Sequence, residues 1–162
     1  QPQSIYLSFT SDVKVCVTRK SQVPTRWIDQ GAIEAIEIAE LPNRYLAGIC
    51  EIELKKYFKD KTNWRTMLTT NKSNIDLLSK KNECYSILPE EAKNFFLSKS
   101  KTLKINYPIL NGIITPKSLN IKKMKTFSGK LIGIKGQYLI FEDSTVFNVR
   151  SNEGLVVNIK ID

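Results

Sequence analysis

Two short β-rich runs at the beginning of the chain place the strongest constraint on its fold. Residues 4–9 read SIYLSF and residues 13–18 read VKVCVT, and only Thr10-Ser11-Asp12 separates them. β-Branched and aromatic residues favour extended backbone, and a short polar linker between two such runs favours a tight connection. The pattern therefore predicts an antiparallel β-hairpin.

A short helix and an ambiguous segment follow this hairpin. Pro24 begins the segment PTRWIDQ and Gly31 closes it, and proline at the start with glycine just past the end is typical of a helix. Residues 33–41 have a composition that favours a helix, whereas the alternation of Ile36 and Ile38 with polar neighbours fits a strand. Both structures remain open for this segment on its pattern alone.

The clearest helical pattern begins after Asn43, whose side chain is suited to cap a helix. The predicted helix runs to about Asp60 and presents one apolar stripe toward the core. The stripe consists of Leu46, Ile49, Cys50, Leu54, Tyr57 and Phe58. At about 100° per residue, Glu51 falls on the shoulder of this stripe, at the edge of the core.

The character of the chain changes twice after this helix. Residues 73–100 have helical composition, interrupted at Leu88-Pro89, and beyond Tyr107-Pro108 glycines punctuate short β-branched runs. The sequence thus predicts the α+β class, with an SH3-like or OB-like β tail. The predicted parts are an N-terminal domain over 1–71, a helical connector over 72–106 and a small C-terminal antiparallel β module over 107–162.

Composition excludes several classes of function. The chain has 162 residues and no histidine, so it contains no Ser-His-Asp or Cys-His catalytic set and no histidine-ligated zinc site. Its apolar runs are far shorter than the roughly 20 residues that cross a bilayer, so we expect no membrane span. Three cysteines without metal-ligand spacing predict a reducing, cytoplasmic location. The start, Gln1-Pro2-Gln3, predicts a fragment whose N-terminus lies upstream.

The net charge of +9 is concentrated in one interval of the chain. Residues 92–141 contain ten lysines and no acidic residue, which is the electrostatic pattern of a surface that binds a polyanion. We therefore predict nucleic acid as a partner, although a merely solvated lysine-rich face is the alternative. The predicted nucleic-acid-binding residues are Lys117, Lys122, Lys123, Lys125, Lys130 and Lys135.

The order of motifs in the N-terminal part resembles the GIY-YIG nuclease superfamily. Ser4-Ile5-Tyr6 and Lys14-Val15-Cys16 stand where the two signature tripeptides stand. The other matching positions are Arg26, Glu51 within AGICEIELKKYF, and Asn63. The resemblance implies a β-β-α-β-α domain, in which 33–41 is the third strand.

The same resemblance implies divalent-metal-dependent hydrolysis of a phosphodiester bond in DNA or RNA. Tyr6, Lys14, Arg26, Glu51 and Asn63 are its catalytic positions, and Glu51 is the ligand of one Mg²⁺ or Mn²⁺. The chemistry suits these residue types, because arginine offers a planar cationic fork to a phosphate and a carboxylate is a ligand that Mg²⁺ prefers. A tyrosine deprotonates water only when nearby positive charge lowers its pKa, and Lys14 is the candidate for that charge.

Three positions depart from the superfamily signature and support a second hypothesis. Lys14 replaces the second signature tyrosine, Cys16 replaces a glycine, and Val17 replaces a lysine. These changes are expected of a non-catalytic nucleic-acid-binding module that keeps the nuclease fold. A protein-interaction scaffold is a third hypothesis. The phrases VPTRWIDQGA, KDKTNW and GIKGQYLIF also resemble an uncharacterised bacterial family, domain of unknown function 2797, over nearly the whole chain.

Overall fold

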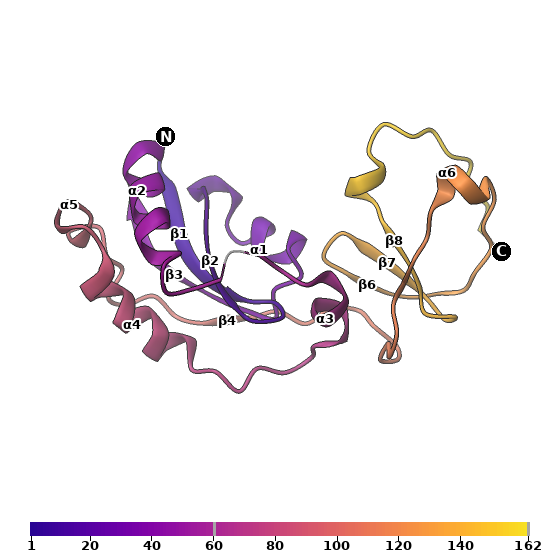
Figure 1. Ribbon diagram of the computed structural model, residues 1–162, viewed down its shortest axis with the longest axis horizontal. Helices are drawn as coiled ribbons and strands as arrows, with labels where there is room; N and C mark the ends of the chain where they lie inside the picture. Colours follow the sequence, from indigo (N-terminus) through magenta and orange to yellow (C-terminus); the bar gives the residue numbers. More distant parts are fainter. Residues whose placement is uncertain (60, 162) are drawn as a thin grey trace. The chain divides into compact units, whose positions relative to one another are not determined.

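The computed structural model describes residues 1–59 and 61–161 of the chain. It divides into two compact units, the first comprising Gln1–Asn106 and the second beginning at Tyr107 (Figure 1). The predicted α+β class is confirmed, with an antiparallel sheet and helices in the first unit and a small sheet in the second. The first unit includes the residues 72–106 that the sequence assigns to a helical connector.

The first unit is organised on a four-stranded antiparallel sheet of order β2-β1-β3-β4. Its strands are β1 (Gln3–Phe9), β2 (Val13–Arg19), β3 (Glu34–Leu41) and β4 (Leu103–Lys104). The predicted hairpin of β1 and β2 is confirmed, and the ambiguous segment 33–41 is a strand. Strand β1 pairs with a neighbour on both sides, and every one of its residues is buried.

Helices occur between and after these strands. They are η1 (Lys20–Gln22), α1 (Thr25–Asp29), α2 (Arg44–Leu54), α3 (Trp64–Thr69), α4 (Leu77–Ile87) and α5 (Glu90–Lys93). Helix α2 packs on β1 and β2, and α4 packs on β3. The break predicted at Leu88-Pro89 separates α4 from α5, because proline at Pro89 lacks the amide hydrogen that an α-helix requires.

Helix α2 begins where the sequence predicts but ends earlier. Asn43 caps it, since the side-chain oxygen accepts a hydrogen bond from the Leu46 amide at 2.9 Å. The helix ends at Leu54, the side chain of Tyr57 is 68% exposed, and Asp60 lies outside the described residues. After Leu54 the chain turns back to the sheet, where the carbonyl of Lys59 accepts a hydrogen bond from the β2 backbone at 3.3 Å.

The sheet of the second unit is mixed, which corrects the predicted antiparallel module. Its order is β5-β8-β7-β6, and β5 pairs with β8 in parallel. The elements are β5 (Lys117–Ser118), α6 (Ile121–Met124), β6 (Leu131–Lys135), β7 (Tyr138–Phe141), β8 (Thr145–Asn148) and η2 (Arg150–Asn152). The chain from β5 passes through α6 and the β6–β7 hairpin before it reaches β8, and this crossover permits parallel pairing.

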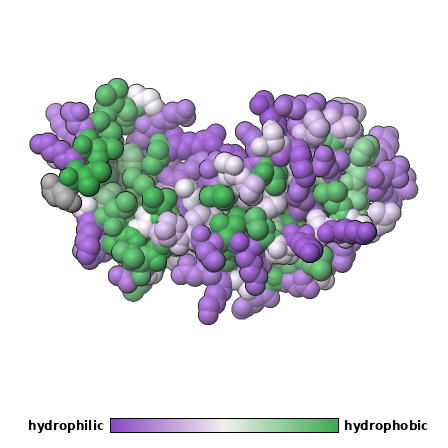
Figure 2. Space-filling view, turned by 180° about the vertical axis from the view of Figure 1, so that it is seen from behind, coloured by the Kyte–Doolittle hydropathy of each residue, from purple (hydrophilic) through white to green (hydrophobic). Residues whose placement is uncertain are grey.

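The core of the second unit is small, and much apolar surface is exposed. Its buried apolar side chains are Ile113, Leu119, Ile132, Ile140 and Val146. Apolar atoms lie among hydrophilic ones over the surface of this unit (Figure 2). Ile114, Val156, Ile159 and Ile161 are each more than three quarters exposed.

Lys135 is part of this interior, which removes it from the predicted nucleic-acid surface. Its side chain is 1% exposed, and its ammonium lies 5.6 Å from the centre of the Tyr107 ring. Burial lowers the pKa of Lys135 from 10.5 to about 8, because the charged form is poorly solvated there. Lys135 is the last residue of β6, and its side chain lies on the core face of this small sheet.

We predict that Lys135 makes stability depend on pH. Between pH about 8 and 10.5 the unfolded chain retains the proton that the folded chain has lost, so the free energy of unfolding rises with pH in this window. The Lys135→Met variant lacks the titrating group and should lose this rise. Urea denaturation of both proteins at several pH values measures the difference, and identical pH profiles contradict the assignment.

Candidate functional site

Tyr6 lies at the centre of the candidate site, on the middle strand β1. Its side chain is fully buried, its ring packs on Trp27 with 5.6 Å between centroids, and its hydroxyl donates to Gln30 Oε1 at 3.2 Å. Burial raises the pKa of Tyr6, and the neighbouring Cys16 raises it further, against a smaller opposite effect of Arg26. The phenol therefore remains protonated at neutral pH. The lowered pKa that we expected for a catalytic base is not found, because burial outweighs the nearby positive charge.

Lys14 lies on the same face of the sheet, one strand away. Its side chain is 6% exposed, and its ammonium donates a hydrogen bond of 2.8 Å to Thr62 Oγ1. The Thr62 hydroxyl lies 3.1 Å from that of Thr10. Burial lowers the pKa of Lys14, and Arg26 also lowers it. Within residues 1–59 and 61–161, no carboxylate forms an ion pair with this ammonium.

Cys16 is a neighbour of several of the candidate site residues. The hairpin register places it directly opposite Tyr6, and side chains opposite each other in an antiparallel pair share a face. Burial raises the pKa of its thiol, which Lys14 and Tyr6 lower and Glu51 raises. Cys16 is thus close enough to Lys14, Tyr6 and Glu51 for each of them to affect the pKa of its thiol. The thiol is a protonated neighbour of the site at neutral pH.

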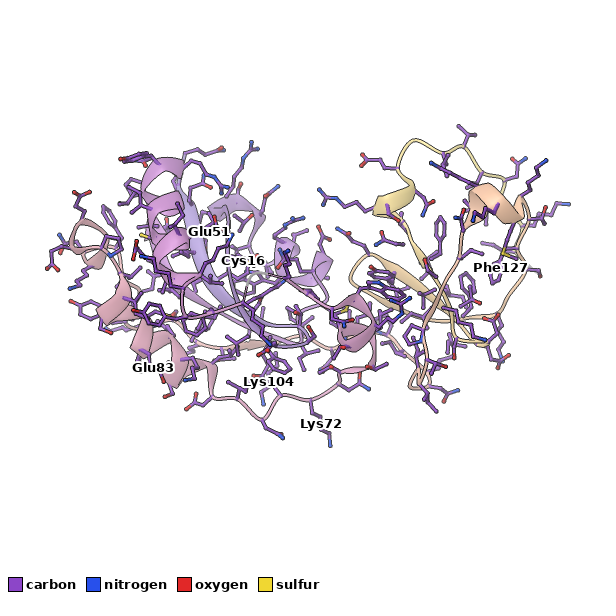
Figure 3. All side chains as sticks on the ribbon, in the orientation of Figure 1. Cys16, Glu51, Lys72, Glu83, Lys104 and Phe127 are labelled. Carbon is purple, nitrogen blue, oxygen red and sulfur yellow. The ribbon has the colours of Figure 1, made fainter. Side chains whose placement is uncertain are left out.

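Arg26 and Glu51 approach this face from two helices. Arg26 is half-buried on α1, and its charge influences the pKa of both Tyr6 and Lys14. Glu51 lies on α2 with its side chain 22% exposed, and it forms an ion pair of 3.3 Å with Lys55. Figure 3 shows Glu51 projecting from α2 beside Cys16, in agreement with its effect on the pKa of the thiol.

The donors near Glu51 allow one hydrated divalent ion but no larger metal site. In the part of the chain that the structure describes, no three histidine, cysteine, aspartate or glutamate side chains are grouped to hold a metal. Mg²⁺ keeps several of its waters and takes as few as one or two carboxylates. The half-buried carboxylate of Glu51 fits this requirement as a single hard oxygen ligand. A bound ion there has to compete with Lys55.

Asn63 has a structural task that the sequence did not indicate. Its side-chain oxygen accepts hydrogen bonds from the Arg65 and Thr66 amides at 3.0 and 3.2 Å, so it caps the beginning of α3. It is exposed, and its side-chain oxygen is directed to the α3 amides. Its neighbour Thr62 reaches the site instead. No sequence signal identifies Thr62, because the contact depends on where the chain passes β2 after α2 ends.

The predicted nucleic-acid-binding lysines of the second unit are exposed, apart from Lys135. The exposed ones are Lys117, Lys122, Lys123, Lys125 and Lys130. Lys130 pairs with Glu142 at 3.1 Å, whereas Lys122 and Lys123 lie in the last turn of the short helix α6. These side chains are accessible to a partner in solution.

We predict that Thr62 stabilises the first unit through its bond with Lys14. The Thr62→Val variant keeps the shape of the side chain but leaves a buried ammonium without this acceptor, which costs about 1–3 kcal/mol. The Thr62→Ser variant keeps the hydroxyl and is the matched control. Urea denaturation should show a clear loss of stability for valine and little for serine. Equal losses in the two variants would contradict this role.

Comparison with known proteins identifies the family but no individual relative. Among the described residues, no helix is both long and apolar enough to span a membrane. No curated protein and no solved structure matches the chain. A family model matches residues 1–157, which is nearly the whole chain. The chain therefore belongs to the family described as "Protein of unknown function (DUF2797)".

Proposed function

We propose that the first unit binds a phosphate group of a nucleic acid and hydrolyses a phosphodiester bond with the help of one divalent ion. The observation that supports this proposal is a set of electrostatic influences: Arg26 affects the pKa of Tyr6 and of Lys14, whereas Lys14, Tyr6 and Glu51 affect the pKa of Cys16. They come from β1, β2, α1 and α2, which are separate segments of the chain. Ionisable groups with perturbed pKa values cluster at functional sites, which supports a functional reading of this group of residues.

The electrostatics of this cluster favour an anionic ligand. Burying an ammonium without a counter-charge costs several kcal/mol, yet Lys14 has only a hydroxyl partner within the described chain, and Arg26 is its neighbour of like charge. An anion beside these two groups relieves both the desolvation and the repulsion. Phosphate, like carboxylate, matches the planar fork of donors that arginine presents.

Each residue has a distinct task in the proposed reaction. Lys14 and Arg26 bind the non-bridging phosphate oxygens and neutralise the charge that develops on them. The protonated Tyr6 hydroxyl orients a water molecule by a hydrogen bond and does not deprotonate it. As the water oxygen bonds to phosphorus, the P–O bond to the leaving oxygen breaks, and the leaving oxygen takes up the proton that the water loses. Glu51 would hold the divalent ion, which would supply positive charge to the leaving oxygen. The resemblance of the motif order to the GIY-YIG superfamily supports these assignments.

We predict that hydrolysis requires Glu51. The Glu51→Gln variant removes the carboxylate charge with little change in shape, so it should lower metal-dependent cleavage of DNA or RNA by about 100-fold or more. Glu53→Gln is the matched control, because Glu53 lies on the same helix and pairs with Lys56. The assay compares Mg²⁺, Mn²⁺ and chelator. Cleavage by Glu51→Gln at the parent rate excludes the mechanism.

A second candidate function is binding of nucleic acid without hydrolysis. One observation favours it: Tyr6 is fully buried and protonated, so it is poorly placed to contact a reacting water. In this case the exposed lysines of the second unit supply affinity through contacts with phosphates. The first unit then contributes its phosphate-binding cations alone.

The lysines of the second unit provide a test of this candidate. Replacing Lys122, Lys123 and Lys125 by alanine should weaken binding to an oligonucleotide and reduce the dependence of affinity on salt by about 0.9 per lost phosphate contact in log–log form. Lys80→Ala is the control, since Lys80 lies on α4 and pairs with Glu83. Fluorescence anisotropy at several salt concentrations gives both quantities. Unchanged affinity and slope in the triple variant would rule these lysines out.

A further inference from the structure

Among the residues that the structure describes, two buried polar groups of the first unit have no hydrogen-bond partner. They are the hydroxyl of Ser8 and the indole N–H of Trp27, whose side chains are 0% and 4% exposed. A buried polar group without a partner loses its hydration and gains nothing in return, at a cost of about 1–3 kcal/mol. Such groups are uncommon in folded proteins, and each one calls for a physical reason.

Both groups lie beside the candidate site. Ser8 is directly opposite Lys14 in the hairpin register, so their side chains share a face of the sheet. Ser8 is also two residues from Tyr6 on β1, and alternation along a strand places these two on that same face. Trp27 packs on the ring of Tyr6 and follows Arg26 in sequence. Both groups are therefore neighbours of Tyr6.

The chemistry of these groups restricts the ligand to an acceptor. An indole N–H, an ammonium and a guanidinium can only donate hydrogen bonds, and a hydroxyl can donate. A ligand that meets Trp27, Lys14, Arg26 and Ser8 together must present oxygens with lone pairs and carry negative charge. A phosphate group has these properties, whereas the amino groups of a nucleobase do not.

We propose that Ser8 and Trp27 are ligand-binding residues, which donate hydrogen bonds to oxygens of the phosphate that Lys14 and Arg26 attract. This inference rests on the proposed function, since it adds two neutral donors to the same site. The donors remain unsatisfied in the ligand-free fold and gain their acceptors on binding. The hydrogen bonds that these donors gain on binding therefore contribute to the affinity for the ligand.

The Ser8→Ala variant separates this role from a structural one. Removing an unsatisfied hydroxyl should leave the thermal midpoint of the ligand-free chain unchanged or higher, and should weaken binding of a fluorescein-labelled oligonucleotide about tenfold. Ser4→Ala is the matched control, because Ser4 is equally buried on the same face but donates to Glu37 at 2.7 Å. It should lower the thermal midpoint and leave binding unchanged. Chelator prevents hydrolysis during both measurements.

Trp27 is tested without a change in the core. The chain has two tryptophans, so a ¹H–¹⁵N spectrum shows two indole signals, and a Trp64→Phe variant assigns them. Titration with inorganic phosphate and then with the oligonucleotide should shift the Trp27 signal and leave that of Trp64 in place. Arg65 stacks on Trp64 at 4.2 Å, so Trp64 reports any general effect of salt.

The outcomes distinguish the inference from the proposed function. A lower thermal midpoint of Ser8→Ala with full affinity, or a Trp27 signal that does not respond while the parent binds, overturns the inference alone. Lys14→Met should abolish most of the binding. If it binds like the parent, or if the parent binds neither probe, the proposed phosphate site fails and the roles of Ser8 and Trp27 fail with it.

Discussion

The pairing of β1 with β2 is the constraint on which the candidate site depends. The register sets Tyr6 opposite Cys16 and Ser8 opposite Lys14, so four side chains of different chemistry share one face of the sheet. A slip of one residue would move this whole set to the other face. The central position of β1, which pairs with β2 and β3 along its length, keeps this register fixed. The helices that carry Arg26 and Glu51 then need only approach the one face.

The rest of the fold compensates the desolvation of the buried polar groups at one end of this face but not at the other. At one end Glu37 accepts hydrogen bonds from Ser4 at 2.7 Å and from Lys20, so its charge is compensated. At the other end Lys14 has a neutral hydroxyl as its acceptor, and Ser8 has none. The same strand therefore contains a satisfied and an unsatisfied serine four residues apart. The serine with an acceptor has a structural role, whereas the serine without one is the candidate for a role in ligand binding.

Much of the first unit could be predicted from sequence because its signals are local. The β-branched runs predict the hairpin, Asn43 predicts the start of α2, and Pro89 predicts the break between α4 and α5. The shoulder position of Glu51 also follows from helical periodicity, and its side chain is half-buried as expected. Each of these features depends on residues within a few positions of one another.

The features that sequence reasoning missed depend on contacts between distant segments. Thr62 meets Lys14 across 48 positions. The burial of Lys135 and the parallel pairing of β5 are likewise decided by the tertiary fold of the second unit. The cap at Asn63 is the exception, because its hydrogen bonds reach only two and three residues ahead.

The positive charges of this chain fall into two groups that differ in their exposure to solvent. Under the proposed function, the exposed lysines of the second unit attract a polyanion over about a Debye length, and their effect falls steeply with salt. Lys14 and Arg26 differ from them, because interactions of buried or partly buried charges are screened much less by salt. The two sets of cations should therefore contribute separable terms to affinity. Under the proposed function, Lys14 and the half-buried Arg26 provide selectivity for one phosphate, whereas the exposed lysines provide affinity that does not depend on position.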